Sequence, residues 1–180
     1  MTTLDVGGGF PSDDLTEEIV QALSITKDDP LNYRVIAEPG RHFSAQPFHL
    51  LTRVIGSNIK ADRTNYFVNE SIYHSFMENI LSNQNFDNAE QFYSRMDIGS
   101  SELRPMGEMK DASVFGMTCC GLDVIARNPS VPEALATNDW LCFSGLGAYT
   151  HSLRTNFNGM RSTEIIESLA VEGSRSTGSL

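Results

Sequence analysis

The first third of the chain alternates between short apolar runs and a helical pattern. Leu4–Val6 is a short apolar run that ends at three successive glycines. Apolar residues from Leu15 to Leu23 recur at the spacing of one helix face, and Tyr33–Ala37 is a second short apolar run. Phe48–Ile55 fits either a helix or a long strand, because periodicity alone does not separate the two. Strands that alternate with helices predict an α/β fold with a parallel sheet up to residue 56.

Beyond residue 56 the apolar runs are short and are separated by turn residues. Strands are expected at Tyr66–Val68, at Val114–Met117, at Trp140–Phe143 and around Tyr149. Ile72–Leu81 fits either a strand or one or two helical turns, and Leu122–Arg127 fits one short helix. The polar stretch 83–90 is expected to be a surface loop, and 173–180 a frayed end. This pattern predicts an all-β sandwich or barrel domain over residues 57–180.

Composition and charge exclude several classes of protein. With 40% hydrophobic and 20% charged residues the chain is globular, and its net charge of −10 repels phosphate backbones and anionic lipids. Neither nucleic acid nor a membrane is therefore an expected partner, and no apolar run approaches the roughly 18–20 residues of a membrane span. The N-terminus lacks a signal-peptide pattern, and three cysteines, two of them adjacent, do not form a disulfide framework. We expect a cytoplasmic protein.

Two loops are compatible with phosphate binding. Gly7, Gly8 and Gly9 follow the first predicted strand, where their N–H groups would either cradle a phosphate or only form a tight turn. Glu38-Pro39-Gly40-Arg41 follows the second strand, and taken alone it also fits a turn that ends a strand. Arg41 can grip a phosphate, while Glu38 can hold a protonated ring nitrogen. Two such loops in consecutive strand–helix units favour a phosphorylated cofactor.

The other candidate residues carry weaker local signals. Cys119 and Cys120 are adjacent, lack the spacer of zinc sites and have no histidine at ligand spacing, so no metal site is expected. A buried pair of small apolar residues is the default interpretation, since a reactive thiol needs an electropositive, partly exposed setting. The four histidines are scattered and form no evident catalytic triad. Tyr149 fits a phosphate donor or, more readily, a half-buried strand residue.

Six motifs, taken in order, resemble the eukaryotic ornithine decarboxylase family of pyridoxal-phosphate-dependent enzymes. They are LDVGGGFP (4–11), AEPGR (37–41), TCCGLD (118–123), DWLCF (139–143), GAYT (147–150) and FNG (157–159). Each motif is weak alone, but their order and rough spacing agree over nearly the whole chain. The resemblance implies an α/β barrel followed by a β domain, in a homodimer with shared active sites. Residues 1–56 would be the last two strand–helix units of the barrel, and residues 57–180 the β domain.

The resemblance also implies roles for individual residues. The residues expected to hold the phosphate of pyridoxal phosphate are Gly7, Gly8, Gly9, Gly40, Arg41 and Tyr149. Glu38 would pair with the cofactor's ring nitrogen and keep the ring an electron sink. Cys119 matches a cysteine that is donated across the dimer interface and helps to protonate the decarboxylated intermediate. Cys120 and Phe157 would line the substrate pocket, and Asp123 matches a carboxylate of an intersubunit ion pair.

Departures from the family pattern limit these expectations. About six of the usual eight barrel strands would precede Leu4, and so would the lysine motif that holds the cofactor covalently. None of the three lysines present lies in that motif. Cys120 replaces an aspartate, and the other carboxylate for a substrate ammonium should fall near Ser82 or Asn83. We therefore expect an ornithine-decarboxylase-like protein of polyamine (putrescine) biosynthesis that is truncated and inactive as an isolated chain. Its substrate preference stays open.

Two other interpretations remain. One is a non-catalytic family member that pairs with an intact decarboxylase subunit, and the other is a degraded gene copy without function. Antizyme binding is not expected, because in the family the region that antizymes grip lies in the missing part of the barrel. Two strand–helix units cannot close a barrel and expose apolar sheet edges, which predicts low stability unless another chain completes them.

Overall fold

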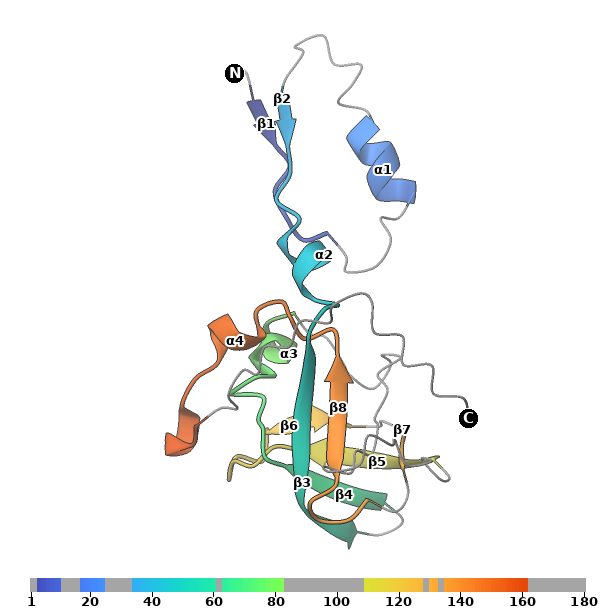
Figure 1. Ribbon diagram of the computed structural model, residues 1–180, viewed down its shortest axis with the longest axis vertical. Helices are drawn as coiled ribbons and strands as arrows, with labels where there is room; N and C mark the ends of the chain where they lie inside the picture. Colours follow the sequence, from blue (N-terminus) through green and yellow to red (C-terminus); the bar gives the residue numbers. More distant parts are fainter. Residues whose placement is uncertain are drawn as a thin grey trace, which may run out of the picture.

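The chain forms two separate sheets, a small one and a large one. The computed structural model describes residues 3–10, 17–24, 34–60, 63–82, 109–127, 130–132 and 135–161. The small sheet and α1 (Glu17–Ser24) lie at one end of the molecule, and the large sheet lies at the other (Figure 1). None of the described helices is long and apolar enough to cross a membrane.

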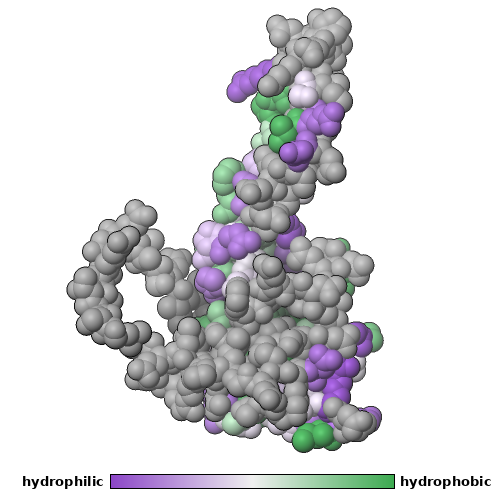
Figure 2. All heavy atoms as spheres, turned by 90° about the vertical axis from the view of Figure 1, so that its right-hand side faces the viewer, coloured by the Kyte–Doolittle hydropathy of each residue, from purple (hydrophilic) through white to green (hydrophobic). Residues whose placement is uncertain are grey.

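The small sheet consists of β1 (Thr3–Asp5) and β2 (Arg34–Ile36), which pair in parallel with Leu4 opposite Val35. The predicted order of strand, helix and strand is therefore present, whereas the described strands at this end form a two-stranded sheet and not a barrel. Val35 and Ile36 remain 38% and 37% exposed, although parallel strands are normally covered on both faces. Figure 2 shows apolar and polar atoms side by side on the surface at this end.

The segment 48–55, which fitted either a helix or a strand, is the start of a long strand. After α2 (Gly40–Ser44), β3 runs over His49–Lys60. Buried Leu50, Thr52 and Val54 alternate with exposed residues, as expected of a strand with one face on a core. The first half of β3 pairs with β8 (Trp140–Ser144), and the rest pairs with β4 (Arg63–Val68). The boundary expected at residue 56 thus falls inside one strand, because β3 belongs to the large sheet from residue 49.

The large sheet is mixed and curled. Its remaining strands are β5 (Met109–Phe115), β6 (Val124–Ala126) and β7 (Ser130–Pro132). The strand order is β6-β5-β4-β3-β8, and β7 pairs with β5. β4 and β5 are parallel, whereas all other neighbours are antiparallel. Figure 1 shows β3 and β8 crossing the direction of β4 and β5, so the sheet bends around its inner face. The described pairings leave β6 and β8 unjoined, which makes this a half-barrel and not a closed one.

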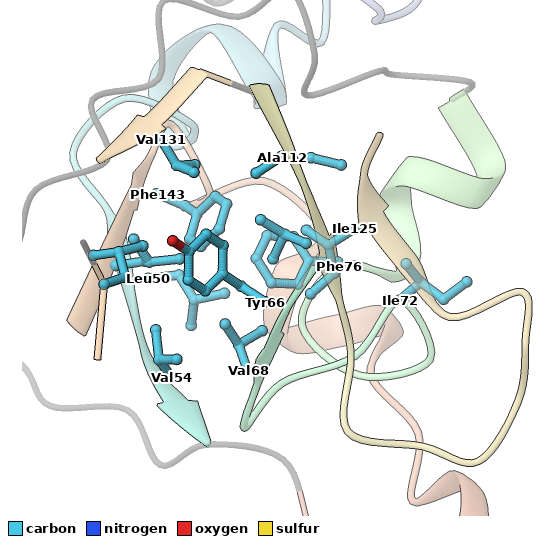
Figure 3. Close-up of a cluster of buried hydrophobic side chains, with 14 of the residues drawn as sticks. Leu50, Val54, Tyr66, Val68, Ile72, Phe76, Ala112, Ile125, Val131 and Phe143 are labelled. Atoms are coloured by element: carbon cyan, nitrogen blue, oxygen red, sulfur yellow. The ribbon is translucent and has the colours of Figure 1, made fainter. Parts of the chain in front are cut away.

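The hydrophobic core lies inside this bend. Figure 3 shows the side chains of β3, β4, β5, β6, β7 and β8 pointing toward one another, with Tyr66 and Phe143 near the centre. Phe76 reaches the same core from the turns before α3 (Met77–Ser82), and its ring meets the edge of Phe143 at 4.9 Å between centroids. Burial of these large side chains supplies the main stabilisation of the large sheet.

Two expectations for the second half are wrong at the level of local structure. Leu122–Arg127 contains a strand and not a helix, because Ile125 and Ala126 are buried against β5. The segment at Tyr149 is not a strand: Tyr149 adopts a left-handed backbone conformation and precedes α4 (Thr150–Leu153). The ambiguous stretch 72–81 consists of turns that lead into α3. The segments 83–90 and 173–180 lie outside the described residues.

Candidate functional site

The two predicted phosphate loops lie against each other. The Glu38 N–H donates to the Gly7 carbonyl at 2.8 Å, and the Gly7 N–H donates to the Asp5 carboxylate at 2.8 Å. Gly7 and Gly9 have φ values of +72° and +82°, which suit glycine. A Cβ on Gly8 would lie 2.7 Å from the Glu38 carbonyl oxygen, so the two backbones meet closely only because residue 8 is glycine.

Arg41 and Tyr149, far apart in the sequence, also meet. The Arg41 guanidinium lies over the Tyr149 ring, 5.3 Å from its centroid, which is a cation–π geometry. Tyr149 is 51% exposed, so much of its ring faces outward. The strand tyrosine favoured by local pattern is therefore wrong, and Tyr149 lies beside Arg41, the other side chain that the resemblance assigns to the cofactor phosphate.

A tight loop holds Tyr149 in this place. The Gly147 N–H donates to the Ala45 carbonyl at 3.0 Å, and the Leu146 N–H donates to the Phe48 carbonyl at 3.2 Å. Any Cβ on Gly147 would collide with the Ser44 carbonyl oxygen. The glycine therefore allows the loop to pack directly on the end of α2, beside Arg41.

Arg41 has a second partner that sequence reasoning missed. Its guanidinium forms an ion pair with Glu78 of α3, whose side chain is largely buried. The hydrogen bond to Glu78 is the main cause that raises the pKa of Arg41, and burial opposes it. No motif pointed to Glu78, because the contact joins α2 to a helix 37 residues away. We call Gly7–Gly9, Glu38–Arg41, Glu78 and Tyr149 the anion cluster.

Cys119 and Cys120 do not form the buried pair that was the default expectation. Cys119 is exposed and Cys120 is half-buried, because the loop that carries them follows β5 at the surface. The Asn158 amide donates to the Cys119 sulfur at 3.2 Å, and the Tyr73 hydroxyl lies 3.1 Å from the Cys120 sulfur. The hydrogen bond between them lowers the pKa of Cys120 and raises the pKa of Tyr73. The described residues contain no group of three potential metal ligands.

Phe157 lies among the residues that surround Cys119 and Cys120. It opens a short 3₁₀ turn (Phe157–Gly159), and its ring packs on Tyr73 with 4.3 Å between centroids. The Thr155 hydroxyl donates to the Tyr73 carbonyl at 2.7 Å and fixes the two segments together. Tyr73, Cys119, Cys120, Phe157 and Asn158 form what we call the thiol cluster. Neither Tyr73 nor Asn158 was expected at this site: Tyr73 has no local signal, and Asn158 was noted only as part of the motif at 157–159.

Asp123 ties the cysteine loop to the chain segment before α3. Its buried carboxylate accepts hydrogen bonds from the Ser71 hydroxyl at 2.9 Å, the Ile72 N–H at 3.0 Å and the Thr118 hydroxyl at 2.6 Å. A Cβ on Gly116 would overlap this carboxylate. The expected intersubunit ion pair stays a prediction; within one chain both carboxylate oxygens already accept hydrogen bonds.

Residues 70–78 connect the two clusters. Glu78 contacts the anion cluster, and Tyr73 belongs to the thiol cluster. Between them, the fully buried His74 ring faces the Phe157 carbonyl oxygen, with 3.4 Å to Nε2. Figure 1 shows α3 and α4 side by side at one end of β3. The anion cluster presents a cation and a phenol that can bind an anion, and the thiol cluster presents two thiols.

Comparison with known proteins gives one consistent family. The model described as pyridoxal-dependent decarboxylase, C-terminal sheet domain, matches residues 29–147. A chloroplastic ornithine decarboxylase of Nicotiana glauca is 37% identical over 94% of this chain and 40% of its own length. Antizyme inhibitor 2 of Xenopus laevis is 33% identical over 92% of this chain and 38% of its own length.

A solved structure has the same fold. The arginine decarboxylase of Paramecium bursaria Chlorella virus, bound to agmatine, superposes with a TM-score of 0.69 at 32% identity, covering 88% of this chain and 42% of that one. The chain thus spans about 40% of the length of the curated relatives it matches.

Proposed function

This chain belongs to the family of pyridoxal-dependent decarboxylases, since it matches the C-terminal sheet domain of that family, and from this premise we propose that it is part of an amino-acid decarboxylase of the ornithine decarboxylase type. The proposed product class is a diamine such as putrescine, as the names of the relatives suggest. The large sheet, from residue 49, would be the sheet domain. The exposed β1–β2 pair would belong to a cofactor-binding barrel that further parallel strands complete.

The residues of the anion cluster fit a phosphorylated cofactor. A cation, a phenol and a glycine loop are the donor types that a phosphate dianion requires. In the proposed site, Arg41, Tyr149 and the Gly7–Gly9 backbone hold the phosphate, and Glu38 faces the ring nitrogen. When bound, pyridoxal phosphate supplies an electron sink for the carbanion left by loss of carbon dioxide. Covalent attachment needs a lysine of the family motif, which by the resemblance would precede Leu4.

The chain's own side chains would perform the remaining steps. Tyr149 orients the Arg41 guanidinium by stacking on it, so the Arg41 side chain loses less conformational entropy when the phosphate binds. Cys119 Sγ, which accepts a hydrogen bond from the Asn158 amide, would deliver a proton across a dimer interface to the reacting carbon. Homodimers, or heterodimers with a full-length decarboxylase subunit, would provide such an interface.

The contact of Arg41 with Tyr149, together with the contact of the glycine loop with Glu38, carries this proposal, and its test is phosphate recognition. We would titrate the chain with pyridoxal phosphate and with pyridoxal, which lacks the phosphate, and follow the binding by absorbance. Arg41→Gln should weaken binding of pyridoxal phosphate by at least about tenfold and leave pyridoxal unchanged, because a charge-assisted hydrogen bond is lost. Arg53→Gln, an exposed arginine on β3, is the matched control. Equal affinity for both ligands would refute the proposal.

A second candidate function is association without catalysis. It is favoured by one relative that is named an antizyme inhibitor and by Glu78, which already neutralises Arg41. Mixing the chain with a full-length decarboxylase subunit distinguishes the two candidate functions. A gain in decarboxylase activity that Cys119→Ala abolishes supports the catalytic candidate. Complex formation that Cys119→Ala leaves intact, with no gain in activity, supports association.

A further inference from the structure

Two groups form hydrogen bonds with the Cys120 sulfur, and both can donate to it when it is a thiolate. One is the Tyr73 hydroxyl, 3.1 Å away and 47 residues distant in sequence, and the other is the Leu122 backbone N–H. Both stabilise the thiolate, and they lower the pKa of Cys120 against the opposing effects of burial and of Asp123. Cys120 is also only partly buried, which leaves a route for a small reagent. A stabilised and accessible thiolate is the combination that makes a cysteine reactive.

The other cysteines provide an internal comparison. Cys142 lies in β8, where burial raises the pKa of its thiol and disfavours the thiolate. Cys119 is more exposed than Cys120, but its donor is the amide of Asn158. The chain therefore contains a partly buried thiol whose pKa is raised, an exposed thiol, and a partly buried thiol that hydrogen-bonds to a phenol; of the three, only the last has a lowered pKa.

We propose that Cys120 is an oxidation site that reacts with hydrogen peroxide to give a sulfenic acid. The Cys120 thiolate attacks one peroxide oxygen, the O–O bond breaks, and an S–O bond forms. The sulfur is oxidised by two electrons, and the second oxygen leaves as hydroxide, which takes a proton from solvent to become water. The Tyr73 hydroxyl remains beside the sulfur and can donate to the new S–O group.

The sulfenic acid should persist instead of closing a disulfide with Cys119. Adjacent Cα atoms are about 3.8 Å apart, below the usual separation of about 4.4–6.8 Å in disulfides. The two sulfurs also face different partners, Asn158 and Tyr73. The product therefore stays available to a small thiol, which would form a mixed disulfide and release water. Because Tyr73 packs on Phe157, a group added at Cys120 would disturb the thiol cluster.

The test is to treat the chain with hydrogen peroxide in the presence of dimedone, which traps sulfenic acids, and to locate the adduct by fragment mass spectrometry. We expect the adduct on Cys120 in the wild type, in Cys119→Ser and in Cys142→Ser, and none in Cys120→Ser. Tyr73→Phe keeps the ring on Phe157 and removes only the hydroxyl. It should slow trapping by at least about threefold, because the thiolate fraction falls.

A second measurement guards against a change in fold. We would measure the rate of iodoacetamide alkylation of Cys120 as a function of pH. The midpoint of this pH profile should lie at a lower pH in Cys119→Ser than in the double variant that also carries Tyr73→Phe. Tryptophan fluorescence reports on the fold of each variant through Trp140 in β8. Trapping mainly on Cys119, or equal rates and pH profiles with and without the Tyr73 hydroxyl in folded protein, would overturn the proposal.

Discussion

The large sheet and the β1–β2 pair are both built from short apolar strands, but they differ in what covers them. In the large sheet, β3, β4 and β8 place Val54, Val68 and Phe143 in a core with no exposed surface. In the small sheet, Val35 and Ile36 keep more than a third of their surface in water. Sequence pattern alone does not separate the two cases, because it reports a strand's residue types and not its neighbours.

This difference assigns separate roles to the two regions. The large sheet carries the free energy of folding, since apolar burial is its main source. The β1–β2 pair contributes the glycine loop and Glu38 to the anion cluster and buries little. We therefore expect mutations in the large sheet to affect unfolding of the whole chain, and mutations in the small sheet to affect only local structure and binding.

The largest expected effect is on the core of the large sheet. Phe143→Ala removes a buried ring that packs on Phe76 and should lower the free energy of unfolding by about 3–5 kcal/mol. Urea unfolding followed by the fluorescence of Trp140, the single tryptophan, measures it. The control is Phe43→Ala in α2, where the ring is 71% exposed and the loss should stay below about 1 kcal/mol. Similar losses for both variants would contradict the comparison.

Part of this fold was predictable and part was not. Strands were expected at Leu4–Val6 and Tyr33–Ala37, and β1 and β2 lie there. A short apolar run between turn residues has few stable structures other than a strand. The strand at 124–126 was missed because three residues are too few for a period, and only pairing with β5 makes them a strand. The continuation of β3 across residue 56 was not predicted, because no local pattern marks the register shift between Val54 and Gly56 within that strand.

An intermediate effect is expected at Asp123, a buried polar residue that directly precedes β6 of the large sheet. Asp123→Asn keeps the shape, but it removes the charge and leaves one oxygen to accept bonds from Ser71, Ile72 and Thr118. Hydrogen bonds to charged groups contribute about 1.5–3 kcal/mol, so we expect a loss of about 2–3 kcal/mol. Asp111→Asn, exposed on β5, is the control and should change stability by less than about 0.5 kcal/mol. Unfolding by urea again decides; equal losses would contradict a structural role for Asp123.

The candidate site was predictable where backbone chemistry is specific. The glycine loop and the Glu38–Arg41 loop follow strands, and parallel strands bring such loops to the same edge, where the structure has them in contact. Glu78 and Tyr73 could not be found in this way, because their contacts depend on how the turns at 72–76 fold between two helices and a loop. Side chains brought together by tertiary packing leave no spacing in the sequence.

The smallest effect on global stability, and the sharpest test of the comparison, is expected at Gly8. In Gly8→Ala the new Cβ would lie 2.7 Å from the Glu38 carbonyl oxygen, so the two loops must separate by some tenths of an ångström. Because β1 and β2 contribute little burial, urea unfolding followed at Trp140 should change by less than about 0.5 kcal/mol. Amide hydrogen exchange should, in contrast, become faster at Val6 and Glu38, whose N–H groups join the two strands and loops. Gly40→Ala is the control, since an added Cβ there meets nothing within 4 Å. A shift of the global transition with Gly8→Ala would show that the small sheet and the large sheet unfold as one unit, and the division between them would then fail.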